Sequence, residues 1–358
     1  MKPLSIGIAG AGLLGRLLAW QLARDGHRVN VFDPALGPEP DYDRVQAAAF
    51  SAAGMLSPLA ELDNSSAEVA LMGWRSLALW PQIVKAMRAS PRFSANGSLL
   101  LAHRSDLASA QRVLSRLDAA MPGTPRAQPL SAGQLAELEP ALHGATHAWL
   151  LPDEGQIDPV GAMRSLHAEA AGAHWNWNRR VTRVEQGALA FDDQSRQRFD
   201  LVFDVRGTGS RPELPVRGVR GETVWLHAPG HGLTRPVRLL HPRHRVYLVP
   251  RPGDIVLVGA SEIESEDRSP VSLRSAVELM AAAHSVMPAL AEARIQRLDA
   301  NLRPALPDNE PRIEVMPGRV RINGLFRHGW LIAPALVEYA LRTCGLAAAQ
   351  PVKELEHE

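Results

Sequence analysis

Apolar and polar residues follow recognisable periods in the first part of the chain, which begins with a short apolar run. Residues 4–9 are mostly apolar and predict a buried strand. Leu13–Arg24 carries leucines at helical spacing and predicts a helix, which Gly26 would end as a C-cap glycine. Arg28–Phe32 predicts a second strand, so the chain is expected to open with a β–α–β unit.

The rest of the chain continues this mixture of patterns. Helices are expected at 67–88, 107–121, 131–139, 160–172, 271–286 and 335–349. Strands are expected at 98–102, 180–186, 188–191, 199–205, 222–227, 246–250, 255–259 and 293–300. Two proline-rich segments, 149–159 and 301–311, are expected as loops, the first marking a crossing between domains. The order of the elements predicts an α/β fold with two domains, each assembled from discontinuous segments.

The sequence GAGLLG at positions 10–15 joins the first predicted strand to the first helix. Gly10 permits a tight turn, Gly12 lets the backbone approach a pyrophosphate, and Gly15 allows close packing of helix and strand. The helix N-terminus adds N–H donors and the positive end of its dipole. Asp33 follows at the distance expected of an acceptor for a ribose hydroxyl, and it disfavours the 2′-phosphate of NADP. The motif predicts dinucleotide binding over a merely structural unit, and leaves NAD and FAD as alternatives.

Composition narrows the class of protein. The 358 residues are 46% hydrophobic and 22% charged, with a formal net charge of +1. This balance gives no reason to expect nucleic acid or an anionic membrane as a partner. The single cysteine, Cys344, excludes an internal disulfide, and no apolar run reaches the length of a membrane span. Because strand-forming residues begin at Leu4, no signal peptide is expected, and the predicted location is the cytoplasm.

Thirteen histidines raise the question of a metal site. None of them forms the HExxH motif or another paired-ligand spacing. His241 and His244 are expected to be solvent-facing or hydrogen-bonded loop residues. No metal is predicted.

Several segments, taken in order, resemble the D-amino-acid oxidase family of flavoproteins, and most closely its glycine oxidase and sarcosine oxidase branch. The resemblance covers almost the whole chain. Besides the glycine motif it rests on SAAGML (51–56), RV (180–181), the strand and glycine turn at 202–209, RGE (220–222), YLVPRPGDIVLVGAS (247–261), LRPALPD (302–308) and FRHGWLIAP (326–334). It implies an interrupted, Rossmann-like FAD-binding domain of the GR2 type, and a smaller α+β substrate domain with a mainly antiparallel sheet. Residues 1–85, 150–215 and 305–358 would form the first domain, and 86–149 and 216–304 the second.

The resemblance implies noncovalent FAD, because Cys344 lies in the last predicted helix and not where sarcosine oxidases tether flavin. The motif glycines would face the pyrophosphate, Asp33 the adenosine ribose, and Val181 the adenine. Residues 51–55, with Gly329 and Trp330, would border the isoalloxazine. The residues expected to contact FAD are Gly10, Ala11, Gly12, Leu14, Gly15, Asp33, Arg44, Ser51, Ala52, Ala53, Gly54, Met55, Val181, Gly207, Arg327, His328, Gly329 and Trp330.

Oxidation of an amino acid by flavin needs a clamp for the carboxylate and correct orientation of the neutral amine, whose Cα hydrogen leaves as hydride to flavin N5. Arginine suits the clamp because its fork makes two charge-assisted bonds to a carboxylate. The resemblance implies that Arg303 is the clamp, with Arg327 beside it. It also implies that Tyr247 helps to hold the carboxylate and that Met55 faces the substrate side of the flavin. Without the resemblance, Arg303 reads as a surface turn, Arg327 as a partner for an acid, and Tyr247 as an ordinary strand residue.

Some positions depart from the family's pattern. Relatives offer hydroxyls and a basic residue to the FAD phosphates where this chain has residues 47–50 (AAAF), which leaves Arg44 as the candidate cation. Arg245 stands where glycine oxidase has a histidine, and Glu262 replaces an apolar residue over the substrate. Arg206 interrupts an apolar strand end. Since an unpaired buried charge is costly, a charge near the substrate either selects a different side chain or pairs internally.

The predicted activity is FAD-dependent oxidation of the C–N bond of a small amine or amino acid. The products would be an imine, which hydrolyses to an oxo acid, and hydrogen peroxide from oxygen. The alternatives are a dehydrogenase that uses another acceptor, a flavin-binding protein with little turnover, and a nicotinamide dehydrogenase. The pattern predicts this reaction class and not the individual substrate.

Overall fold

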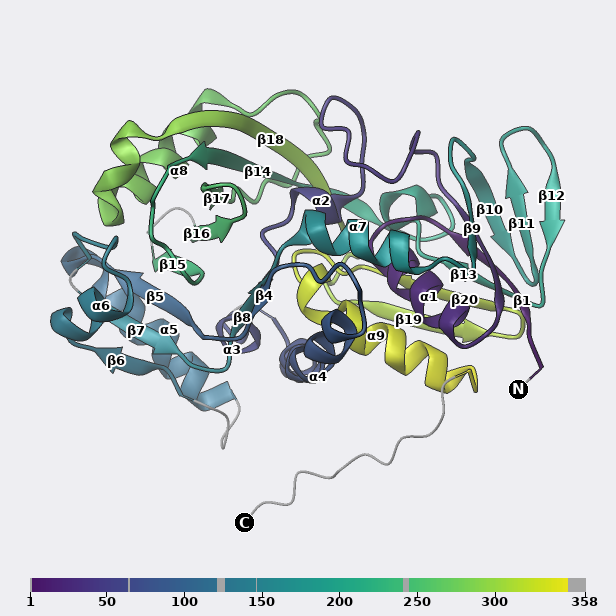
Figure 1. Cartoon of the computed structure of the whole chain (residues 1–358), viewed down its shortest axis with the longest axis horizontal. Coiled ribbons are helices and arrows are strands. Elements are labelled where there is room, and N and C mark those ends of the chain that lie inside the picture. The colour runs from purple at the N-terminus through teal and green to yellow at the C-terminus, as the bar shows by residue number, and fades with distance from the viewer. Residues whose placement is uncertain (1, 64, 121–125, 146, 241–244, 347–358) are drawn as a thin grey trace, which may run out of the picture.

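The computed structural model describes residues 2–63, 65–120, 126–145, 147–240 and 245–346. Two large sheets organise these residues, one in each half of the molecule (Figure 1). His241 and His244 lie outside the described residues.

The first sheet is six-stranded and parallel except at one edge. Its order is β19 (Arg312–Met316), β20 (Arg319–Asn323), β13 (Leu201–Asp204), β1 (Ser5–Ala9), β2 (Arg28–Phe32) and β9 (Ala173–Asn176). Side chains alternate across β1, so that Ile6 and Ile8 enter a helix-covered core while Ala9 faces the other side. The bounds of β2 are those predicted, and β1 begins one residue later than predicted.

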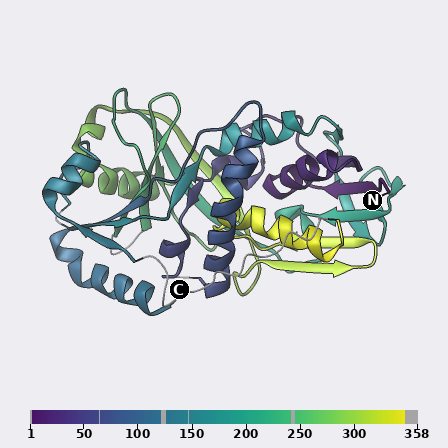
Figure 2. The ribbon, with the colours of Figure 1, turned by 60° about the horizontal axis from the view of Figure 1, so that its bottom comes forward.

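Helices cover one face of the six-stranded sheet and a small sheet covers the other. The helices are α1 (Leu13–Arg24), α7 (Pro159–Glu169) and α9 (Gly329–Thr343), and α4 (Ala67–Lys85) packs against α9 between the two halves of the molecule (Figure 2). The opposite face carries a meander of β10 (Val181–Glu185), β11 (Ala188–Phe191) and β12 (Arg196–Arg198). Residues of β1 and β2 are therefore buried on both faces, as expected of a parallel sheet.

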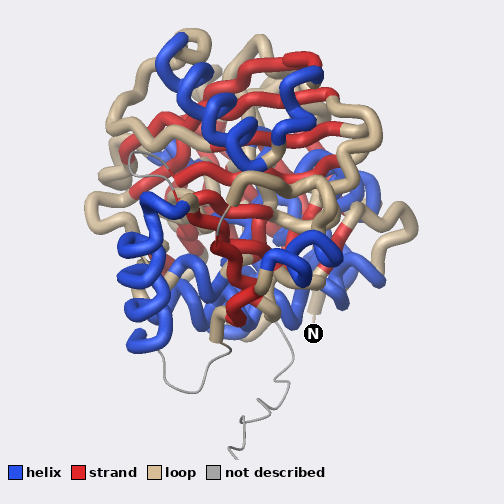
Figure 3. The backbone as a smooth tube through the Cα atoms, turned by 90° about the vertical axis from the view of Figure 1, so that its left-hand side faces the viewer, coloured by secondary structure: helices blue, strands red, loops and turns tan. Residues whose placement is uncertain are grey.

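The second sheet is eight-stranded and antiparallel except where β15 meets β5. Its order is β18 (Arg294–Ala305), β14 (Arg217–His227), β17 (Ile255–Gly259), β16 (Arg245–Arg251), β15 (Val237–Leu240), β5 (Ser98–Ala102), β7 (His147–Leu151) and β6 (Gln128–Leu130). The other elements of this half are α5 (Leu107–Ala120), α6 (Ala132–Leu138), α8 (Leu273–Val286) and the short 3₁₀ turns η1 (Arg104–Asp106) and η3 (Pro288–Glu292). Figure 3 looks onto this half, with helices in front of the strands.

Alternation along the strands of the second sheet gives it two different faces. Val246 and Leu248 of β16 pack with α8 in one apolar core. Tyr247, between them, points to the opposite face, and Arg238 of β15 is its cross-strand partner there. This opposite face is turned toward the first half of the molecule, where it forms a cavity wall.

The segments between the sheets are short. The small-residue stretch after residue 46 folds as α2 (Ala48–Ser51), β3 (Met55–Leu56) and α3 (Pro58–Glu61). β3 pairs with β8 (Gly155–Ile157), which also pairs with β4 (Phe93–Ser94). The predicted loop at 149–159 was therefore wrong in part, since it contains the end of β7 and all of β8. Turn-forming residues such as Pro152 and Gly155 favoured a loop in the sequence. The two strands form there because they pair with strands that are distant in sequence.

The loop predicted at 301–311 was also wrong in part, because β18 continues through Pro304 to Ala305, whereas residues 306–311 lie outside any helix or strand. β14 begins at Arg217, five residues before the predicted start, and pairs with β18 along this whole length. Proline is tolerated because β18 is the edge strand of the sheet. Arg303 therefore lies in a strand and not in a surface turn.

The last helix, α9, begins six residues before its predicted start and contains Pro334. A proline inside a helix leaves the carbonyl four residues earlier without its N–H partner. That carbonyl belongs to Trp330, and it accepts a hydrogen bond of 3.0 Å from the indole N–H of Trp80 in α4. The packed neighbour thus satisfies the group that the proline leaves open.

We propose the division into domains that the sequence predicts. Every strand of the six-stranded sheet falls within 1–85, 150–215 and 305–358. The strands of the eight-stranded sheet fall within 86–149 and 216–304, apart from the last residues of β7 and β18. In the part of the chain that the structure describes, no helix is both long and apolar enough to cross a membrane.

Candidate active site

A cavity of about 850 Å³ lies between the two sheets and brings the predicted site residues together. Its volume is in the upper part of the range of ligand pockets. Every residue predicted to contact FAD or substrate lines it, except Ala11 and Gly15. The wall runs from the β1–α1 turn, past residues 44–55, to the face of the eight-stranded sheet that carries Tyr247 and Arg303.

The glycine turn has the geometry that each of its glycines was predicted to need. Gly10 has φ +107°, and a Cβ there would stand 2.7 Å from the carbonyl oxygen of Val205. A Cβ on Gly15 would stand 1.9 Å from the carbonyl oxygen of Gly10, so Gly15 acts in packing and does not reach the cavity. A Cβ on Gly12 would meet only the Cβ of Ala47, at 3.8 Å. Gly12 therefore leaves space that the protein itself does not fill.

Asp33 organises this turn through two backbone hydrogen bonds. Its Oδ2 accepts from the N–H of Ala11 at 2.6 Å, and its Oδ1 accepts from the N–H of Ala35 at 2.9 Å. Each oxygen keeps a lone pair that can accept from a ribose hydroxyl. Ala11 thus contributes by holding Asp33 and not by lining the cavity.

Arg251 was not among the predicted site residues. Its guanidinium binds the backbone of the small-residue segment (51–56) on the side away from the cavity. Its Nη2 donates to the carbonyl oxygens of Ala52 and Ala53 at 2.8 and 2.6 Å, and its Nη1 donates to that of Ile157 at 3.1 Å. Burial lowers the pKa of Arg251 to about 10, although Asp158, 3.6 Å away, acts in the opposite direction. These contacts hold residues 52–53 against the cavity with their carbonyls turned away from it.

Arg303 lies across the neighbouring strand with its guanidinium in the cavity wall. Its Nη1 donates to the carbonyl oxygen of Arg220 at 3.3 Å, and its Nη2 donates to that of Ser261 at 3.1 Å. Burial lowers the pKa of Arg303, and the nearby Tyr247 and Glu262 act against this shift. Among the described residues, Arg303 forms no ion pair, which leaves its fork free to bind an anionic ligand.

Tyr247 lies beside this arginine on the same face of the sheet. A Cβ on Gly259, its partner on β17, would stand 2.5 Å from the hydroxyl oxygen of Tyr247, so only glycine fits under the ring. Within the described part of the chain the hydroxyl forms no hydrogen bond. Burial raises the pKa of Tyr247, and the charge of Arg303 offsets this only in part. Met55 packs against the same apolar cluster as the ring.

Glu61 contacts the other basic side chains at this end of the cavity. Its Oε2 accepts from Nη2 of Arg327 at 2.8 Å and lies 3.2 Å from Nδ1 of His328. Its Oε1 accepts from Nη2 of Arg238 at 3.2 Å. Burial opposes ionisation of Glu61, but the charges of Arg327, His328 and Arg238 outweigh it and hold the pKa of Glu61 well below its ordinary value.

Neither Glu61 nor Arg238 was predicted as a site residue. The local signal for Glu61 is weak: it is an acid five residues after the small-residue segment at 51–56. Arg238 sits in an otherwise apolar strand, and only its pairing with Tyr247 shows that it faces the cavity.

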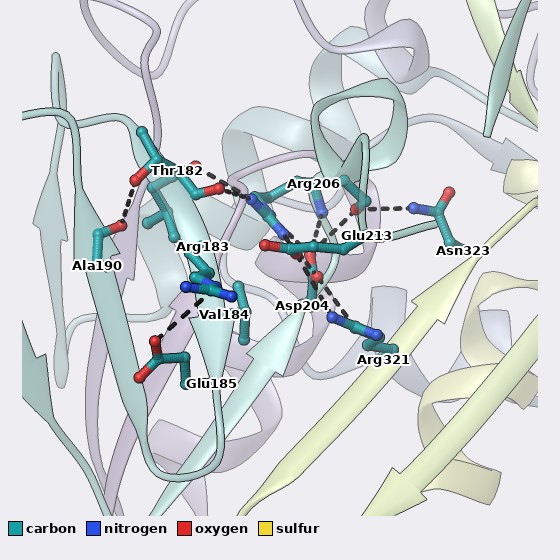
Figure 4. Close-up of polar contacts among 12 residues, drawn as sticks. Thr182, Arg183, Val184, Glu185, Ala190, Asp204, Arg206, Glu213, Arg321 and Asn323 are labelled. Atoms are coloured by element: carbon teal, nitrogen blue, oxygen red, sulfur yellow. Dashed lines mark hydrogen bonds and ion pairs between the residues drawn. The ribbon is translucent and has the colours of Figure 1, made fainter. Parts of the chain in front are cut away.

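The departures from the family pattern have different outcomes. Arg206 pairs internally with Asp204 and Glu213, and Arg321 joins the same cluster (Figure 4). Asp204 is fully buried and accepts from Nε and Nη2 of Arg206 at 2.8 Å each. The charge of Arg206 is therefore matched within the protein.

The other departures are Arg44, Glu262 and Arg245. Arg44 is exposed, lines the cavity and pairs with Asp41 at 3.4 Å. Glu262 lies 3.4 Å from Arg327. Arg245 begins β16, and its side chain lies outside the description. Among the described residues, no three His, Cys, Asp or Glu side chains are arranged to hold a metal ion.

Comparisons with known proteins agree over nearly the whole chain. A family model described as DAO, FAD dependent oxidoreductase, matches residues 5–341. A Rhizobium etli protein named as a candidate thiamine biosynthesis oxidoreductase, ThiO, is 35% identical over 347 residues, which cover 96% of this chain and 97% of that protein. The glycine oxidase of Pseudomonas putida is 30% identical over 372 residues, covering 96% and 95%. The crystal structure of glycine oxidase from Geobacillus kaustophilus matches with a TM-score of 0.81 at 24% identity, covering 99% of this chain and 98% of that one.

Proposed function

The chain belongs to the DAO family of FAD-dependent oxidoreductases, and we propose that its substrate is a small α-amino acid held by one carboxylate. The reaction breaks the Cα–H bond, whose hydrogen leaves with two electrons, and an N–H bond, whose hydrogen leaves as a proton. The imine that forms is hydrolysed by water to an oxo acid and ammonia, or to an amine when the nitrogen carries a substituent, and oxygen takes up two electrons and two protons as hydrogen peroxide. FAD, when bound, supplies the two-electron acceptor.

The residues of the cavity fit an extended FAD. The space beside Gly12 and the helix N-terminus suits a pyrophosphate, and Asp33 suits the adenosine ribose. Residues 51–54 line the cavity with small side chains that suit a flat ring system, and Arg251 holds their backbone at Ala52 and Ala53. Gly329 and Trp330 lie on the wall as well, with the indole N–H of Trp330 donating to the carbonyl oxygen of Ala49 at 3.1 Å.

The observation that carries the substrate proposal is the pairing of charges at the far end of the cavity. Three arginines line this end, Arg238, Arg303 and Arg327. Glu61 pairs with Arg238 and Arg327, whereas Arg303 is held only by neutral carbonyl oxygens among the described residues. Glu262 is a second acid at this end, 3.4 Å from Arg327, so one substrate carboxylate on Arg303 would give three anions for the three arginines and would accept two charge-assisted hydrogen bonds from the fork.

The neighbours of Arg303 would orient such a substrate. The hydroxyl of Tyr247 has no partner among the described residues and is placed beside the arginine, so it can donate to the same carboxylate. With the carboxylate fixed, the amine and Cα–H would project toward Met55 and the small-residue wall. Holding the reacting atoms in one orientation can supply much of the rate enhancement. The names of the glycine oxidases make glycine the first substrate to test.

The experiment is to record the visible spectrum of the purified protein under anaerobic conditions while adding glycine, sarcosine, proline and D-amino acids. Bleaching of a flavin spectrum by one of them supports the reaction class, and the rates rank the substrates. Oxygen uptake with hydrogen peroxide release then separates an oxidase from a dehydrogenase. A flavin spectrum that no amine bleaches would overturn the proposal in favour of a flavin-binding protein with little turnover. The cytoplasmic location stays a prediction from the sequence.

A further inference from the structure

Glu262 is an acid of the cavity wall that its neighbours leave partly open. It lies on the loop after β17, and its side chain is 48% exposed. Oε2 accepts from Nη1 of Arg327 at 3.4 Å, a long contact, and among the described residues Oε1 has no hydrogen bond. The shorter contact of Arg327, 2.8 Å from its Nη2, is with Oε2 of Glu61. One carboxylate oxygen of Glu262 is therefore available to a ligand.

The backbone on both sides of Glu262 is pinned to β14. The N–H of Ser261 donates to the carbonyl oxygen of Glu222 at 3.2 Å. Ile263 and Arg220 exchange two backbone hydrogen bonds of 2.9 and 3.0 Å, as in a β-bridge. A side chain between two such anchors is presented from a rigid backbone, which favours a defined role in ligand recognition.

Glu262 is also next to the arginine proposed to hold the substrate. Nη2 of Arg303 donates to the carbonyl oxygen of Ser261, the residue before Glu262, and the two side chains interact through their charges. Arg268, which lines the cavity from the same loop, has its strongest charge interaction with Glu266. A ligand whose carboxylate rests on Arg303 thus carries its other substituents close to a negative charge.

We propose that Glu262 is a charge filter for the substrate. It favours amino acids whose side chain or N-substituent ends in a cation, and it disfavours those with a second carboxylate. This inference rests on the proposed function, because it takes the carboxylate on Arg303 as its starting point. Two unit charges a few ångströms apart near a protein surface attract or repel enough to change binding about tenfold or more.

Binding to the oxidised holoenzyme tests the filter without turnover. Three ligands of similar size share one carboxylate and differ at the other end: 4-aminobutyrate (cation), succinamate (neutral) and succinate (anion). Flavin difference spectra, recorded anaerobically, give a Kd for each. For the native protein we expect 4-aminobutyrate to bind most tightly and succinate least, with about tenfold between charged and neutral ligands.

Glu262→Gln should bring the three Kd values together, because the amide keeps the size of the side chain and removes its charge. The matched control is Glu264→Gln on the same loop, whose carboxylate pairs with Arg217 at 3.0 Å and does not line the cavity. It should keep the native order. Unchanged ratios in Glu262→Gln, tightest binding of succinate by the native protein, or binding of none of the three would overturn the filter. Native ratios in a protein that no amino acid reduces would instead overturn the proposed function alone.

Discussion

The guanidinium of Arg303 rests over the backbone of Gly221 on the neighbouring strand: a Cβ on Gly221 would stand 2.4 Å from its Cζ. Because the conflicting atoms are the far end of a flexible side chain, Gly221→Ala should fold and displace the guanidinium. We expect kcat/KM for carboxylate substrates to fall about tenfold or more, since small misplacements of a positioning group are costly. Gly133→Ala is the control, because a Cβ there meets nothing within 4 Å. Native kinetics in Gly221→Ala would remove the positioning role.

Replacing Arg303 tests the clamp itself. Arg303→Ala removes two charge-assisted hydrogen bonds, each contributing about 1.5–3 kcal/mol, so kcat/KM should fall about a hundredfold or more. Arg303→Lys keeps the positive charge but lacks the forked guanidinium, so its kcat/KM should lie between those of the native protein and Arg303→Ala. The measurement is steady-state oxidation together with the flavin content of each variant. Flavin content should stay native; an unchanged kcat/KM would exclude Arg303 as the clamp.

Two glycines of the same turn should respond differently to alanine. Gly12→Ala meets only Ala47, so the fold should survive while the bound flavin is crowded, at a cost of about 1–3 kcal/mol in FAD binding. Gly15→Ala collides with the Gly10 carbonyl and should instead lower the melting temperature of the flavin-free protein. Flavin content after purification and thermal melts separate the two effects. Equal loss of stability in both variants would contradict the assignment of Gly12 to the ligand.

Glu61 should make stability depend on pH in the acid range. Its pKa is lower in the folded protein than the value of about 4.3 expected when unfolded, so its contribution is present at neutral pH. That contribution is lost as pH falls below about 4.3 toward the folded pKa. Glu61→Gln leaves the guanidinium groups of Arg238 and Arg327 with a neutral partner and should cost about 3–5 kcal/mol at pH 7.

Urea unfolding at pH 7 and at several values below 4.5 measures both effects of the Glu61→Gln change. The difference between native and variant protein should shrink as the pH falls. A difference that is constant with pH would show that the pairing of Glu61 does not control the titration.

The part of the site that is proposed to bind the dinucleotide could be predicted from the sequence. Its parts are consecutive: a strand, three glycines at fixed spacing, a helix and an acid at the end of the next strand. Hydrophobic periodicity and the conformational freedom of glycine act over a few residues, so both can be recognised without knowledge of the fold. The predicted bounds of α1, β2 and β5 agree with the structure. The resemblance added the substrate-side residues, which no local pattern would have joined.

What the sequence by itself determined is therefore the β–α–β opening, the place of most of the longer helices and strands, and the glycine turn of the predicted dinucleotide site. Only the tertiary structure decided which charges meet. Glu61 and Arg327 are separated by 266 positions, and Arg251 and Ala52 by 199. Such contacts depend on how the two sheets face each other, so the residues next to them in the sequence do not predict them. The same holds for Gly221 and Gly259, which look like ordinary strand glycines until Arg303 and Tyr247 are placed over them.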